Sequence, residues 1–111
     1  MEDRFFADAG LAREVLEPGL VSRKLRARGG GLMMVEVFFE DGAVGAEHRH
    51  PHEQVSYCLA GAFRFSVDGE SRTLGPGDSV FIPASALHGT LCLAAGRLLD
   101  IFTPQREDFL T

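Results

Sequence analysis

The stretch Glu47-His48-Arg49-His50-Pro51-His52-Glu53-Gln54 decides how this chain is interpreted, because it holds three of its four histidines. His48, His50, His52 and Gln54 have the same parity, and a β-strand places residues of one parity on one face. Neutral imidazole is the commonest protein ligand for divalent transition metals. The stretch therefore predicts a metal site. A solvated histidine-rich turn is the alternative, since such short tracts are weak signals taken alone.

The same parity argument selects the next ligand. If the extended backbone continues through the turn at Pro51, Gln54 points inward with the histidines and Glu53 points away. The fourth histidine, His88, follows a Gly-x5-Pro run from Gly77 to Pro83 and is the remaining imidazole that could complete the site. We expect His52 and Glu53 to be solvent-exposed or to support the ligands from behind.

The composition indicates one soluble globular domain. The chain has 111 residues, close to the commonest domain size, and 24% of them are charged. Its formal charge of −5 argues against nucleic acid or an anionic membrane surface as the main partner, because such binding requires cationic side chains. A local basic run is expected to form an exposed strand face or a charged sheet edge: Arg23, Lys24, Arg26 and Arg28.

We expect residues 1–19 to form an N-terminal lead-in, helical or irregular over residues 8–17, and residues 20–111 to form a single domain. The start has no signal-peptide pattern, and no apolar run approaches the roughly 20 residues of a membrane helix. A cytoplasmic location is the resulting expectation. Cys58 and Cys92 lie far apart in apolar surroundings, which predicts two buried free thiols.

From Leu20 onward, short apolar and β-branched runs alternate with glycine-rich turns, which predicts an all-β fold. Phe63, Phe65 and Val67 alternate with polar residues, so one face of that strand should be core. Asp68-Gly69 predicts a hairpin turn. About eight or nine strands are expected, as in a jelly roll or small barrel around one small ligand; the runs cover residues 20–27, 32–39, 55–59, 62–67, 70–74, 79–82, 88–94 and 97–103.

Two motifs together resemble those of the cupin family. The first, Gly-x5-His-x-His-x3-(Glu)-x6-Gly, is matched by Gly42, His48, His50, Gln54 and Gly61, with glutamine in place of glutamate. The second, Gly-x5-Pro-x-Gly-x2-His-x3-Asn, keeps its spacing at Gly77, Pro83, Ser85, His88 and Cys92 but lacks its second glycine and its asparagine. The resemblance implies a double-stranded β-helix (jelly-roll) barrel, one divalent metal between the motifs, and a homodimer.

Within that family, the stretch around His48 and the tail from Leu99 to Phe109 look like the pectin-degradation cupins of the KdgF type. Those proteins convert 4,5-unsaturated uronate monosaccharides, the products of pectin and alginate lyases, into linear 5-keto-4-deoxyuronate. The resemblance implies a metal-dependent, isomerase-like enzyme with an anionic sugar substrate. It implies the metal ligands His48, His50, Gln54 and His88 and the active-site residues Asp100, Phe102 and Arg106.

These residue types suit the chemistry. Ring opening of the cyclic hemiacetal removes a proton from the anomeric hydroxyl, and the resulting enol must gain one on carbon. Asp100 shares strand parity with Leu98 and Phe102, and an inward carboxylate on an apolar strand needs a reason. It is either a proton carrier or an acid paired with Arg97 or Arg106. Arg106 is either a bidentate carboxylate-binding group or a surface residue, and Phe102 is either a wall of the site or core.

Two other functions stay open at this stage: a cupin dioxygenase with a redox metal and a small organic substrate, and a non-catalytic sugar- or metal-binding protein. The sequence does not select among nickel, zinc, manganese, iron and cobalt, because all accept imidazole and amide oxygen. A set of three histidines and one glutamine carries no negative charge, so a bound dication would keep its full charge for an anionic substrate.

Overall fold

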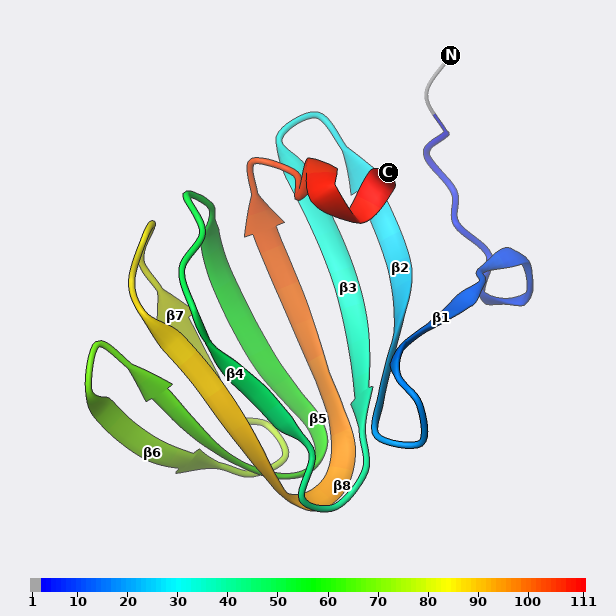
Figure 1. The fold of residues 1–111 in the computed structure, drawn as a ribbon. Coiled ribbons are helices and arrows are strands. Elements are labelled where there is room, and N and C mark those ends of the chain that lie inside the picture. Colours follow the sequence, from blue (N-terminus) through cyan, green and yellow to red (C-terminus); the bar gives the residue numbers. More distant parts are fainter. Residues whose placement is uncertain (1–2) are drawn as a thin grey trace.

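The computed structural model describes residues 3–111, and these form an antiparallel all-β fold, as predicted (Figure 1). The described part has eight strands and two short 3-10 helices. In chain order the elements are η1 (Asp8–Gly10), β1 (Arg13–Glu17), β2 (Val21–Gly29), β3 (Leu32–Phe39), β4 (Val44–His48), β5 (Glu53–Val67), β6 (Glu70–Leu74), β7 (Ser79–Ile82), β8 (His88–Thr103) and η2 (Glu107–Leu110).

Strands β5 and β8 hold the fold together because each runs through both layers. The first half of β5 pairs with β7 and with the second half of β8, which continues to β3, β2 and β1. The second half of β5 pairs with β6 and with the first half of β8, which continues to β4. The two strands bend together where their register shifts, between Cys58 and Phe63. This bend turns one sheet into two facing layers.

Close packing at the bend requires glycine. Gly61 has a φ of +84°, and a Cβ atom there would lie 2.5 Å from the carbonyl oxygen of Ala94. Both the left-handed backbone and the lack of space exclude a side chain. This residue is the last glycine of the first motif, so that motif position serves the fold rather than the chemistry.

The core lies between the two layers. Phe39 and Phe63 pack edge to face with ring centroids 5.2 Å apart, near the buried free thiols of Cys58 and Cys92. The expected free cysteines are confirmed, and burial raises the pKa of both thiols. A second, smaller cluster contains Met33, Val35 and Phe102, with Phe109 of η2 packed against it. The predicted inward face is also confirmed, because Phe63 and Phe65 are buried while Arg64 is exposed.

Several strand boundaries differ from the expectation. The runs over residues 55–59 and 62–67 are one strand, β5, and those over 88–94 and 97–103 are one strand, β8. Glycines interrupt the sequence pattern at the bend but not the pairing. Strand β4 was not among the expected runs, because its residues are largely polar or small and it is stabilised by pairing with β8.

The helical or irregular character expected over residues 8–17 is wrong for its second half. Residues 8–10 form a 3-10 turn, but β1 pairs with β2 in a register that places Arg13 opposite Lys24. This pairing attaches part of the predicted lead-in to the sheet, and the division at residue 19 stays a prediction. Among the described residues, no helix is long and apolar enough to cross a membrane.

Candidate metal site

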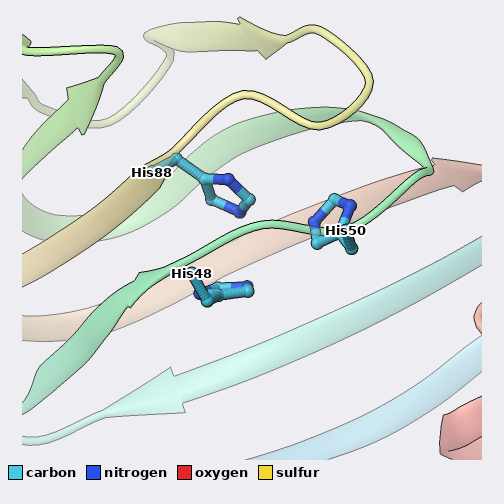
Figure 2. Close-up of side chains that lie close together, drawn as sticks. All are labelled: His48, His50 and His88. Atoms are coloured by element: carbon cyan, nitrogen blue, oxygen red, sulfur yellow. The ribbon is translucent and has the colours of Figure 1, made fainter.

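Strand register brings the predicted histidines together inside the barrel. His48 ends β4 and is the register partner of His88, the first residue of β8. His50 follows in the turn that leads into β5. One ring nitrogen from each of the three lies within 4.8 Å of the others. Figure 2 shows the three imidazoles pointing toward a common space, His48 and His50 from one segment of the chain and His88 from another.

Backbone carbonyl groups fix the tautomer of each ring in the same way. The Nδ1 atom of His48 lies 2.9 Å from the carbonyl oxygen of Ala46, and that of His88 lies 2.9 Å from Ala86. The Nδ1 atom of His50 lies 3.0 Å from the carbonyl oxygen of His52. A carbonyl oxygen only accepts, so each Nδ1 carries the proton and each Nε2 keeps a lone pair. In metal-binding histidines, one ring nitrogen is typically held by such a hydrogen bond while the other binds the metal.

Gln54 points into the same space and Glu53 points to solvent, as the parity predicted. The Oε1 atom of Gln54 lies 2.9 Å from Nε2 of His50. Burial lowers the pKa of His50, so its neutral ring holds one proton, and that proton is on Nδ1. Two acceptors therefore face each other at about the separation of neighbouring ligands around a transition-metal ion. A metal cation bound to both atoms would satisfy their lone pairs. These ligand atoms therefore fit a divalent metal.

A hydrogen-bonded chain connects this group to Asp100. The amide nitrogen of Gln54 donates to Oγ of Ser56 at 2.9 Å, and the Ser56 hydroxyl donates to Oδ1 of Asp100 at 2.6 Å. Ser56 is fully buried and is the register partner of Asp100 across β5 and β8. Burial raises the pKa of Asp100 to about 6, against the lowering effect of the Ser56 hydrogen bond.

The alternative in which Asp100 is paired with an arginine is wrong for this structure. Arg97 points to the other side of the sheet and donates to the buried carboxylate of Glu36 at 2.7 Å. Arg106 binds Asp108 through two hydrogen bonds of 2.8 and 3.0 Å. The hydrogen-bonding partners of Asp100 are thus the neutral side chains of Ser56 and Gln54, which is an unusual environment for a half-buried carboxyl group.

Arg106 and Phe102 also reach the site. Phe102 is buried, and its ring centroid lies 5.8 Å from that of His50. Arg106 packs over the Phe109 ring with its guanidinium carbon 4.3 Å from the ring centroid. However, its Nε and Nη2 edge is occupied by Asp108. Nη1 is therefore the nitrogen with no hydrogen bond among the described residues, and substrate binding by Arg106 stays a prediction.

These side chains surround a cavity of about 220 Å³. This is smaller than most drug-sized ligand pockets, so the cavity suits a small ligand. It is lined by Leu16, Arg23, Val37, His48, Gln54, Phe65, His88, Leu98, Asp100, Phe102, Arg106 and Phe109. A larger cavity of about 440 Å³, between the N-terminal segment and the sheet, contains none of the histidines. We therefore take the smaller cavity, which contains the candidate metal ligands and Asp100, as the functional site.

The sequence analysis gave no part in the site to Ser56, Arg23 or Leu16. Ser56 could have been found, because it has the parity of Gln54 on the same strand. Arg23 and Leu16 carry no sequence signal, because Arg23 reaches the cavity through the pairing of β2 with β3 and Leu16 through the pairing of β1 with β2. Arg23 belongs to the basic run that was expected to be exposed. Its side chain is only 14% exposed, so that expectation is wrong for this residue.

Ser85 stands where the second motif has a glycine, and its backbone has a conformation that is typical of glycine. Ser85 has a φ of +63°, a left-handed conformation that glycine adopts more readily. Its amide donates to the carbonyl oxygen of His50 at 2.8 Å. This hydrogen bond joins the loop before His88 to the loop that carries His50, so the two motifs are held at a fixed distance.

Comparison with known proteins agrees with this geometry. The family model described as "Cupin domain" matches residues 35–102. The pectin degradation protein KdgF of Dickeya dadantii is 39% identical over 109 residues, covering 96% of this chain and 98% of that protein. The structure of KdgF from a Halomonas species superposes with a TM-score of 0.90 at 37% identity, covering 97% of this chain and 99% of that one.

A second solved structure, an RmlC-like cupin from Shewanella frigidimarina, has a TM-score of 0.91 at 38% identity and covers 97% of this chain and 96% of its own. Both the matched model and the nearly full-length relatives support one conclusion. The chain belongs to the cupin family, and within that family it is similar to the pectin degradation proteins called KdgF.

Proposed function

We propose that this protein is a metal-dependent enzyme that opens 4,5-unsaturated uronate monosaccharides and converts them to linear 5-keto-4-deoxyuronate. The observation that carries the proposal is the juxtaposition of two groups in one cavity. Three Nε2 lone pairs and the Gln54 amide oxygen converge, and Asp100 lines the same cavity and is connected to Gln54 through Ser56. The similarity to KdgF supports the same assignment.

His48, His50, Gln54 and His88 would hold the metal. A divalent ion bound there supplies Lewis acidity to the substrate's oxygen atoms. These ligands are all neutral, so the ion's charge is not cancelled by the protein and the site favours an anionic sugar. The cavity also carries the guanidinium groups of Arg23 and Arg106, which extend this positive region toward the cavity's rim.

Asp100 is the residue we assign to proton transfer. It is the only carboxyl group among the described residues that line the cavity. The anomeric hydroxyl loses a proton as the bond from the anomeric carbon to the ring oxygen breaks, which gives an aldehyde and an enol. The enol then gains a proton on carbon and loses one from oxygen, so the reaction is an isomerisation without net gain or loss of atoms. Phe102 forms a wall of the cavity.

The test is to mix the metal-loaded protein with freshly lyase-generated unsaturated uronate and follow the ultraviolet absorbance of its conjugated double bond. We expect faster loss of absorbance with the native protein than with buffer, and loss of this acceleration in Asp100→Asn or after chelation. Glu70→Gln, on the exposed β6 hairpin outside the cavity, should behave as the native protein does. No acceleration by the native protein would contradict the proposal, and oxygen consumption instead would favour a dioxygenase.

We also propose that the protein is a homodimer. Val55 is the register partner of both Ile101 and Phe81, and Tyr57 is two residues further along β5, on the same face as Val55. These four side chains therefore adjoin on the outer face of the sheet. All four are at least 36% exposed. A second copy covering this face would remove the apolar patch from water. Sedimentation velocity should give twice the mass of one chain, and a monomer for Phe81→Glu. A monomeric native protein would overturn this assignment.

The cytoplasmic location stays a prediction.

A further inference from the structure

Two guanidinium groups contact the same aromatic ring at the edge of the cavity. The guanidinium carbon of Arg23 lies 3.8 Å from the ring centroid of Phe109, and that of Arg106 lies 4.3 Å from it. Both side chains are largely buried, with 14% and 12% of their surface exposed. Two cations in such a poorly solvated place each need a compensating negative charge or a hydrogen-bonding partner.

Each arginine is held by one carboxylate on its outer edge. Glu14 on β1 accepts from Nε and Nη2 of Arg23 at 3.1 and 3.3 Å, as Asp108 does for Arg106. The third nitrogen, Nη1, makes no hydrogen bond in either residue within the described part of the chain, yet neither Nη1 is a buried unpaired atom. The two nitrogens are therefore solvated donors on arginines that line the cavity.

We propose that Arg23 is a specificity-determining residue that binds the substrate's carboxylate together with Arg106. This rests on the proposed function, since it specifies how that site selects a charged sugar. Glu14 and Phe109 position the Arg23 guanidinium, and the Nη1 atoms of the two arginines are the donors left for the substrate's carboxylate. Arg23 and Glu14 precede the matched family segment of residues 35–102, and Arg106 and Phe109 follow it. Substrate selection thus comes from the flanks of the common fold.

The experiment compares kcat and KM for the unsaturated uronate and for its uncharged methyl ester. The variants are Arg23→Gln, Arg23→Lys and the control Arg72→Gln, whose arginine also binds a carboxylate, Glu70, but is 76% exposed and outside the cavity. Losing a charge-assisted hydrogen bond should raise KM for the acid roughly 10- to 100-fold in Arg23→Gln, with kcat and the ester's KM nearly unchanged.

Arg23→Lys keeps the charge but not the planar fork, so its KM for the acid should lie between that of the native protein and that of Arg23→Gln. It also serves as the test if Arg23→Gln does not fold. An equal change for acid and ester, an unchanged KM, or a loss confined to kcat would each overturn the role of Arg23. Arg72→Gln should match the native protein in every measurement.

Calorimetry with galacturonate and galactose separates this inference from the proposed reaction, because neither sugar can react. If the native protein lacks ring-opening activity but binds galacturonate more tightly than galactose, and Arg23→Gln loses that preference, the reaction is wrong and the anion site stands. If the native protein is active and Arg23→Gln keeps the preference, the reaction stands and this inference is overturned.

Discussion

Replacing Asp100 with asparagine should make the metal-free protein more stable at neutral pH while removing its activity. The cause is the burial that raises the pKa of this carboxyl group from 3.8 to about 6. The folded protein then binds the proton more tightly than the unfolded chain does, so stability falls as pH rises from about 4 to about 6. Above that range the native protein carries the full cost of a charged, half-buried carboxylate.

The size of the effect follows from the same values. The difference between 3.8 and about 6 corresponds to about 3 kcal/mol at pH 7, taken as an upper limit. Asparagine keeps the oxygen that accepts from Ser56 but adds an amide N–H group that needs a partner, which costs about 1 kcal/mol or more. The expected net gain is about 1 to 2 kcal/mol, and each kcal/mol raises Tm by about 4 °C in a domain of this size.

Urea unfolding with a chelator present, at pH 4.5 and at pH 7.5, measures this. The gain in Asp100→Asn should be present at pH 7.5 and small at pH 4.5, where the native carboxyl group is protonated. Asp108→Asn is the matched control of opposite sign, because its hydrogen bonds with Arg106 hold the pKa of Asp108 below its usual value. That variant should be less stable than the native protein at pH 7.5. An Asp100→Asn protein that is destabilised at pH 7.5, or equally stabilised at both values, would refute the reasoning.

Three further predictions concern separate parts of the molecule. Gln54→Glu should retain metal by elemental analysis but raise KM for the uronate about 10-fold or more, because it adds a negative charge to the site; a lower KM would contradict this. Ser85→Gly should raise the free energy of unfolding by about 0.5 to 1 kcal/mol, since it relieves a left-handed backbone at some cost in chain entropy, and a decrease in urea unfolding would count against it. Cys58 and Cys92, buried thiols with raised pKa values, should react with a disulfide reagent at pH 8 far more slowly in the native protein than in urea, whereas equal rates would mean exposed thiols.

The sequence determined the fold class and the direction of the candidate ligands. Alternating parity is a local property of an extended chain, so the inward direction of Gln54 and the outward direction of Glu53 could be predicted without a structure. The spacing of the two motifs likewise predicted that His88 would join His48 and His50. The two interrupted strands were misjudged because glycine breaks a sequence pattern even where backbone pairing continues across it.

Tertiary structure alone decided which groups face each other across strands. Only the register of β5 and β8 shows that Ser56 is the partner of Asp100, and only the pairing of β3 with β8 explains why Arg97 binds Glu36 instead. The pairing of β2 with β3 is what places Arg23 beside Val37 at the cavity. The physical reason is that a side chain's direction depends on its own backbone, whereas its partner depends on the register of a strand far away in sequence.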